Sequence, residues 1–203
     1  EGSARVRWLR DAERYQVHMD VAIGPSFAPL MARRMTSEGV LGAGGLMPRR
    51  YQEETRVGLS TRRNGVQMDA QRVVLANGTE RPTPPGVQDS ASQFVQMSFM
   101  FTLNPALLKA GSSVTIPVAL PRRVDNWIYD VVGEETLQTA VGSIKAFHVR
   151  PRRESPRQGE LTAQAWFAPS LRYLPVRIMI HQDAETFVDL LLDAMPTLAE
   201  PER

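Results

Sequence analysis

Two groups of side chains in this sequence have residue types that could do acid–base or metal chemistry. The first is His18 with Asp20, which are two residues apart in a predicted strand and therefore share one face of it. An imidazole beside a carboxylate can move a proton or help to bind a divalent metal. The other histidines, His148 and His181, lie far away in the sequence and read as ordinary strand residues. A metal site therefore lacks a second histidine at ligand spacing.

The second group is Glu134 with Glu135, and it does not define a reaction either. Adjacent acidic residues in a predicted turn usually both face water. The sequence contains no Gly-x-Ser-x-Gly elbow, no P-loop and no dinucleotide fingerprint. The glycine-rich stretch 42–45 lacks the spacing and the following helix of a phosphate-binding loop. We therefore expect a protein that is not an enzyme, with no catalytic residue, no metal and no cofactor.

The amino-acid composition excludes some classes of site and of binding partner. The 203 residues include no cysteine, which excludes disulfides, zinc–thiolate sites and thiol catalysis. The basic residues are almost all arginine, and the 22 acidic residues leave a formal charge of only +2. Nucleic acid is not expected, because its binders carry a larger basic excess. Arginine pairs recur at 33–34, 49–50, 62–63, 122–123 and 152–153, and they are consistent with phosphate or anionic-lipid binding or with solvated surface.

The elements that must position these side chains are mostly strands. Three antiparallel strands are predicted between Gly159 and Asp193, because residues alternate in character over 161–168 and 176–180, and 187–192 is a strongly apolar run that follows a polar turn. The same alternation predicts a strand over 12–23 and another over 30–37, with a turn at Glu38-Gly39. Asn64-Gly65 carries a hairpin signal. The small residues at 42–45 suggest a bulge, a bend or a close approach of the backbone.

One stretch, Asp89 to Leu108, breaks the β pattern and predicts a helix. Asp89 is a plausible N-cap, and the apolar residues spread around most of the helix surface. A helix of this kind is buried, either as a plug or lid for a curved sheet or packed flat on a sheet as ordinary core. We count roughly ten strands, more than an open sheet holds comfortably. The fold expected is mainly β: a single antiparallel β-barrel or half-open barrel in one domain over 1–203, with 1–11 and 194–203 as loose ends.

Several short motifs, in this order along the chain, resemble a known family. They are Gly45-Leu46-x-Pro48-Arg49, Gln88-Asp89-Ser90-x-Ser92, Val132-Gly133-x-Glu135-x-Leu137-x-Thr139-x-x-Gly142, Ala165-Trp166-Phe167 and Leu174-Pro175-Val176-Arg177. They resemble the proteobacterial cell-envelope proteins catalogued as domain of unknown function 3108. The resemblance implies an exported, periplasmic protein, in some members anchored through an N-terminal segment that this chain lacks, and it implies no catalytic residue. No run approaches the ~20 apolar residues of a membrane span.

A fainter resemblance concerns the hairpin that follows Trp166. A strand ending in Trp, a short turn and Leu-Pro-Val-Arg-Ile is similar to the LolA/LolB-type lipoprotein carriers, which are half-open barrels that hold acyl chains. We therefore expect a cavity that binds a lipid or another hydrophobic ligand. Its expected lining residues are Phe94, Met97, Phe101, Trp127 and Trp166.

Two alternatives stay open at this point. The same side chains could fill the barrel completely, as they do in small barrels. The protein would then be an envelope interaction or assembly protein that docks a protein or an anionic polymer. Exposed strand edges and the arginine-rich loops around 49–50 and 152–153 would form that surface.

Overall fold

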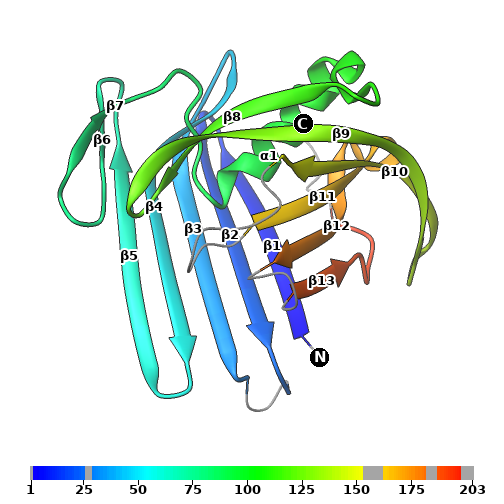
Figure 1. Cartoon of the computed structure of the whole chain (residues 1–203), viewed down its shortest axis with the longest axis horizontal. Helices are drawn as coiled ribbons and strands as arrows, with labels where there is room; N and C mark the ends of the chain where they lie inside the picture. Colours follow the sequence, from blue (N-terminus) through cyan, green and yellow to red (C-terminus); the bar gives the residue numbers. More distant parts are fainter. Residues whose placement is uncertain (1, 26–28, 153–161, 182–186, 198–203) are drawn as a thin grey trace.

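The chain folds into two antiparallel sheets with one α-helix between them (Figure 1). The computed structural model describes residues 2–25, 29–152, 162–181 and 187–197. The strands of the first sheet, sheet A, follow one another in chain order from β1 to β7. They are β1 (Gly2–Asp11), β2 (Arg14–Ile23), β3 (Met31–Gly42), β4 (Gly45–Val57), β5 (Ser60–Met68), β6 (Arg72–Val74) and β7 (Glu80–Pro82).

The second sheet, sheet B, is also a meander, in the order β13-β12-β11-β10-β9-β8. Its strands are β8 (Ser113–Leu120), β9 (Arg123–Thr139), β10 (Gly142–Pro151), β11 (Thr162–Ala168), β12 (Leu174–His181) and β13 (Phe187–Leu191). The last three are the strands predicted between Gly159 and Asp193, which confirms that prediction; the expected turn at 182–185 lies outside the described residues. In Figure 1 the strands of sheet B run across those of sheet A.

The fold was expected to be a β-barrel or a half-open barrel, and the described strands do not close into a single barrel. Their ladders make two separate sheets, and Gln88–Val118 is an isolated parallel bridge outside them. The mainly β class, the antiparallel pairing and the single α-helix agree with the prediction. Alternation along a strand shows which face is buried, but it does not reveal whether the last strand returns to the first. The alternation of residues therefore could not predict whether the strands close into a barrel.

Residues 2–11 were expected to be a loose end and are instead a strand. β1 pairs with β2 along its whole length, from Gly2 opposite Ile23 to Asp11 opposite Arg14. All of β1 is exposed, so it has no buried face to produce a hydrophobic alternation. Of the other expected loose end, residues 194–197 have no regular structure and 198–203 lie outside the described residues.

Three predicted turns are also wrong, and one of them, Glu134-Glu135, lies inside β9 opposite Phe147 and Ala146. Glu38-Gly39 lies inside β3, at a shift in the register between β3 and β4. A Cβ on Gly39 would come within 2.2 Å of the Met47 carbonyl oxygen. Glycine is needed there for close packing and not for a turn. Asn64-Gly65 lies inside β5, and the real hairpin joins Val57 to Ser60. The Asn64 side chain instead donates a hydrogen bond to Glu53.

The predicted helix is present but shorter than expected. α1 (Ser92–Leu103) ends at Asn104, and a 3₁₀ turn, η1 (Pro105–Leu108), follows it. The N-cap position is Ala91 and not Asp89 as predicted, but the Asp89 carboxylate accepts the backbone N–H groups of Ala91 and Ser92, both at 2.9 Å, in the turn that leads into the helix. No helix in the described part of the chain is long and apolar enough to cross a membrane.

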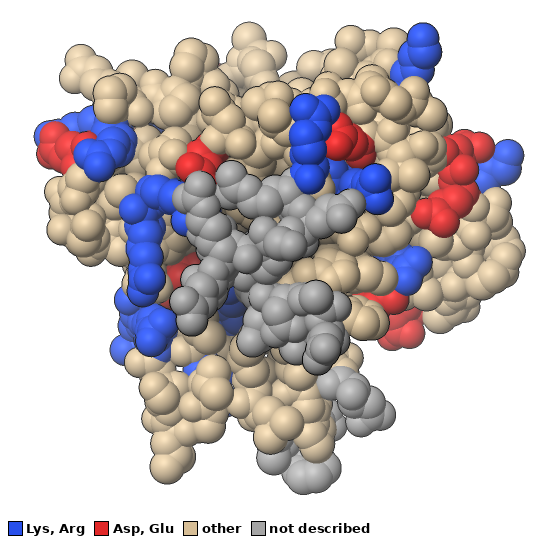
Figure 2. Space-filling view, in the orientation of Figure 1, with Lys and Arg blue, Asp and Glu red and all other residues tan. Residues whose placement is uncertain are grey.

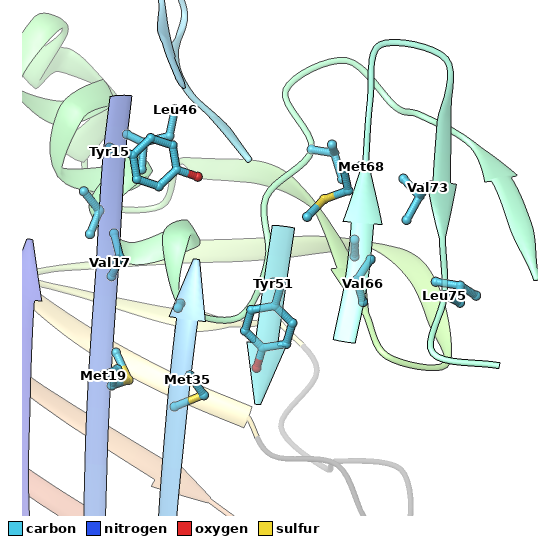
Figure 3. Packing of buried hydrophobic residues seen from close by; sticks show 14 of the residues in the cluster. Tyr15, Val17, Met19, Met35, Leu46, Tyr51, Val66, Met68, Val73 and Leu75 are labelled. Carbon is cyan, nitrogen blue, oxygen red and sulfur yellow. The ribbon is translucent and has the colours of Figure 1, made fainter. Parts of the chain in front are cut away.

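The helix divides the interior into two cores. On one side Ala91 and Val95 pack with the inner face of sheet A, where Figure 3 shows Val17 and Met19 on β2 beside Met35 on β3. On the other side a second core joins the helix to the inner face of sheet B. Its helix residues are Phe94, Met97 and Phe101. The helix therefore packs between the two sheets and contacts the core of each.

Candidate ligand-binding cavity

A cavity of about 840 Å³ lies between the two sheets, beside the N-terminal half of α1. Sheet A supplies one wall through β2, β3, β4 and β5. The other wall comes from α1, the β8–β9 hairpin, β11, β12 and β13. This volume falls within the ~300–1,000 Å³ of typical small-molecule sites.

The apolar part of the sheet A wall follows from strand alternation. β2 contributes Met19, Val21 and Ile23, and β3 contributes Met31 and Met35. Side chains two residues apart point to the same face, so each strand places its alternate residues in the cavity. Methionine is unbranched and flexible, so its side chain can adapt to ligands of different shape.

The opposite wall is apolar as well. Phe94 of α1 and Trp127 of β9 line it. Ala163 and Ile180 lie further along sheet B, with Val188 on β13. The small side chain of Ala163 leaves space that a larger residue would fill. The two walls together enclose apolar surface on both sides of the cavity.

A charged network is built into the sheet A wall. Arg33 on β3 donates a hydrogen bond to Glu53 on β4 at 2.6 Å, and Glu53 is only 9% exposed. Tyr51 and Asn64 donate to the same carboxylate at 2.8 and 2.9 Å. Burial by itself raises the pKa of Glu53, but the charge of Arg33 and these hydrogen bonds outweigh it and leave the pKa below its ordinary value. Glu53 is therefore ionised and fully bonded.

The rim of the cavity carries further arginines. Arg62 on β5 and Arg122 in the β8–β9 turn are exposed and line it, and Arg123 beside them forms an ion pair with Asp125. The turn is fixed to sheet A because the Ala76 N–H donates to the Pro121 carbonyl at 2.9 Å. Figure 2 shows basic side chains gathered on this side of the molecule, over β4, β5 and the β8–β9 turn.

Of the five residues predicted to line a cavity, the structure brings two to this one. Phe94 and Trp127 are among its lining residues. Met97 and Phe101 are fully buried in the core between α1 and sheet B, where Phe101 meets the Phe167 ring edge-on at 5.0 Å. Helical spacing alone does not distinguish core from lining when a helix is apolar on most sides.

Trp166, the fifth of these residues, lies on the other face of sheet B. It stacks on His148 with ring centroids 4.2 Å apart, and the guanidinium of Arg177 lies 4.6 Å from its ring centroid on the neighbouring strand. Its indole N–H donates to Glu135. The indole of Trp166 therefore contacts side chains of β9, β10 and β12, and these contacts connect the four neighbouring strands β9 to β12. Burial lowers the pKa of His148.

The helix is fixed to sheet A by two glutamine side chains. Gln96 accepts the Leu46 N–H at 2.8 Å and donates to the Gly44 carbonyl at 2.9 Å. Gln88, just before the helix, donates to the Leu46 carbonyl at 2.9 Å. Gly45 has φ +109°, and a Cβ there would lie 2.2 Å from the Gln96 Oε1 atom. Of the bulge, bend or close backbone approach suggested for 42–45, the close approach is found at this contact, and residues 43–44 also form the turn between β3 and β4.

A buried acid completes the attachment. Asp89 has no exposed surface and accepts the Ser37 hydroxyl at 2.5 Å, while Ser37 is also hydrogen-bonded to Tyr15 at 3.1 Å. Burial raises the pKa of Asp89 to about 6, although hydrogen bonds from Ser37, Ser92 and Ala91 oppose the shift. The residues 88–92 thus hold the start of the helix against sheet A.

The acid–base candidates of the sequence have other partners. His18 is hydrogen-bonded to Thr36 at 3.3 Å, and Asp20 accepts from Arg34 at 2.8 Å. Within the described ranges, no group of three or more His, Asp or Glu side chains could hold a metal ion. Sequence reasoning missed the methionine wall and the Arg33–Glu53 pair. The alternation in 12–23 and 30–37 carried a signal for the wall, but it did not distinguish a cavity from a filled core.

Together, the fold and the site define an antiparallel β-protein of two sheets with a cavity beside its helix. Among solved structures, a β-barrel-like protein of domain of unknown function DUF1849 from Brucella abortus is similar in fold, with a TM-score of 0.55 and 9% identity over 95% of this chain and 86% of that one. A DUF1089 family protein from Pseudomonas aeruginosa is similar with a TM-score of 0.46 and 9% identity, over 86% of this chain and 88% of that one. No curated protein matches the sequence.

The family itself is shown by the sequence. Residues 2–190 match the family described as "Protein of unknown function (DUF3108)", and the chain belongs to that family. The resemblance drawn from the short motifs is confirmed in this respect. Neither of the two similar structures is described as a LolA/LolB-type carrier, and that fainter resemblance stays a prediction from the hairpin residues.

Proposed function

We propose that this protein binds a hydrophobic ligand, a lipid or acyl chain, in the cavity between its two sheets. The observation that carries the proposal is the 840 Å³ cavity with apolar residues on both walls. In this proposal the protein is a binding protein of the periplasm and not an enzyme. The resemblance of the short motifs to cell-envelope proteins supports that compartment, whereas the absence of cysteine fits a periplasm and a reducing cytoplasm equally.

Burial of the ligand supplies the affinity. Each methylene group removed from water contributes about 0.8 kcal/mol, so an acyl chain of ordinary length needs few polar contacts to bind. The lining residues Met19, Val21 and Met35 are each only 5–6% exposed, so they are apolar side chains set deep in the wall of sheet A. Their flexibility favours acceptance of chains of more than one shape.

A binding test follows from the two walls. Dodecyldimethylamine oxide has a twelve-carbon tail and a head without net charge, and its binding below the micelle concentration can be followed by calorimetry. The variant Ala163→Trp places a large ring in the cavity, and we expect it to weaken this binding by about tenfold, equivalent to the loss of roughly two buried methylene groups. Ala32→Trp is the matched control, because Ala32 alternates with the lining residues Met31 and Arg33 and so faces away.

The outcome separates a carrier from a filled or dry interior. Native mass spectrometry of gently purified protein is expected to show a co-purifying hydrophobic ligand. If the protein carries no ligand, and if no amphiphile binds to it or raises its melting temperature, the proposal is wrong.

A second candidate function is the docking of an envelope partner at β1. This edge strand is exposed throughout, and Val6, Trp8 and Leu9 are 37–52% exposed on it. Edge strands with unpaired backbone groups are sites for the addition of another strand. Substitution of Val6 by Pro would block such pairing, and capture of a partner that survives this change would exclude β1 as the docking edge. The arginine-rich loops expected to dock a partner are only partly present. Arg49 and Arg50 are exposed but lie inside strand β4, which pairs with β3 and β5, and not in a loop. Arg152 pairs with Asp130 at 2.7 Å, and Arg153 lies outside the described residues.

A further inference from the structure

We infer that the ligand of this cavity is an amphiphile with an anionic headgroup, held at the rim by Arg62 and Arg122 with its tail against the methionine wall. This inference rests on the proposed function and adds the chemical class of the ligand. The class of ligand follows from the positions of the charged side chains among the residues that line the cavity.

The deep part of the cavity has no net charge. Glu53 is the only acidic residue among the lining residues that the structure describes, and its carboxylate binds Arg33, Tyr51 and Asn64. Arg33 and Glu53 therefore neutralise each other. Three donors converge on the carboxylate, whereas the buried Nε of Arg33 has no hydrogen-bond partner among the described residues. This pair fixes the wall and leaves the adjacent methionines as the surface for a tail.

The rim, in contrast, carries positive charge that the described residues do not balance. Arg123 pairs with Asp125, but in the described part of the chain neither Arg62 nor Arg122 forms an ion pair or a side-chain hydrogen bond. Arginine remains charged at any physiological pH, and its planar fork binds carboxylate or phosphate oxygens. These two residues come from different sheets, so a headgroup between them would be held from both sides.

The positions of the arginines and methionines also determine the orientation in which the ligand binds. The basic side chains are exposed, while Met19, Val21 and Met35 lie deeper and are almost fully buried. A tail that enters toward the methionines leaves its headgroup at the arginines, and the opposite orientation would bury a charge among apolar side chains. A cationic headgroup would meet like charge at the rim. The site is therefore selective for the sign of the headgroup.

The experiment compares three ligands with the same twelve-carbon tail, all below their micelle concentrations: dodecyl phosphate, dodecyldimethylamine oxide and dodecyltrimethylammonium. Calorimetry on the whole chain is expected to show dodecyl phosphate binding about tenfold more tightly than the amine oxide, as two exposed charge contacts supply. The cationic ligand is expected to bind most weakly. Inorganic phosphate is the fourth arm, and it shows whether the headgroup binds without a tail.

Variants then locate the preference. Arg62→Gln/Arg122→Gln is expected to abolish the tenfold preference while binding of the amine oxide stays the same. The control Arg56→Gln/Arg63→Gln removes the same charge from neighbouring positions of β4 and β5 that do not line the cavity, and it is expected to keep the preference.

Each outcome has one meaning. Equal affinity of the wild type for all three ligands overturns the inference and leaves the proposed function intact, as does a preference that survives Arg62→Gln/Arg122→Gln. Failure of every tailed ligand to bind overturns the proposed function itself. Binding of inorganic phosphate as tight as that of dodecyl phosphate would show an anion site that takes no tail, and it too overturns the inference.

Discussion

The contact between Gly45 and Gln96 makes a quantitative prediction, because it joins the helix to sheet A through a single glycine. Gly45→Ala introduces a Cβ at φ +109°, a conformation that costs a non-glycine residue about 1–2 kcal/mol. The new methyl group would lie 2.2 Å from the Gln96 Oε1 atom and would displace that side chain. The displaced glutamine loses its hydrogen bonds to Leu46 and Gly44.

The magnitude follows from these two terms. Each of the two hydrogen bonds contributes about 1 kcal/mol, so with the backbone strain we expect Gly45→Ala to lower the free energy of unfolding by about 3–4 kcal/mol. Gln96→Ala alone is expected to cost about 2 kcal/mol. In that background Gly45→Ala costs only the backbone strain, about 1–2 kcal/mol, because no side chain remains to be displaced.

Urea unfolding followed by circular dichroism measures all four members of this double-mutant cycle. Gly44→Ala is the matched control, because no atom lies within 4 Å of a Cβ at the neighbouring glycine. Its expected change is within about 0.5 kcal/mol. Additive effects of Gly45→Ala and Gln96→Ala, or an effect of Gly45→Ala no larger than that of Gly44→Ala, would refute the reasoning.

Two further predictions concern buried charge. Asp89 has a pKa of about 6 in the folded protein, against ~3.9 in the unfolded chain, so its ionisation disfavours the folded state. We therefore expect the free energy of unfolding to fall by about 3 kcal/mol as the pH rises from 4 through 6. Asp89→Asn is expected to remove this contribution, and urea unfolding from pH 4 to 7.5 with an unchanged slope in the variant would contradict it. Arg33→Met leaves the Glu53 carboxylate without its counter-charge and is expected to cost about 3–5 kcal/mol. Arg33→Met/Glu53→Leu is expected to recover most of this loss at pH 7, and failure to recover would assign the effect to the packing of Arg33.

The cavity and the filled interior are alternatives that the sequence left open, and the reason is physical. Alternation in 12–23 and 30–37 shows that one face of each strand is apolar, which is equally true of a core and of a cavity wall. Whether that face meets other side chains depends on the distance to the opposite sheet. In this structure residues of α1 pack with the cores of both sheets and lie beside the cavity, an arrangement that alternation within a strand does not predict.

The predictions that failed share a cause with this ambiguity. Gly39 and Asn64 have the residue types of turns, yet they lie inside strands because Met47 and Glu53 on a neighbouring strand need a small side chain or a hydrogen-bond donor there. The exposed strand β1 gave no hydrophobic alternation because neither of its faces is buried.

The sequence by itself determined the mainly β class, the C-terminal meander, the single apolar helix with Asp89 at its start, and the family. These depend on local periodicity and on short motifs, which are written in consecutive residues. Only the tertiary structure decided that the described strands form two sheets, that Trp166 faces away from the interior, and that Arg62 and Arg122 line the same cavity. Those facts depend on contacts between strands far apart in the chain, and side-chain alternation within one strand does not specify which distant strand faces it.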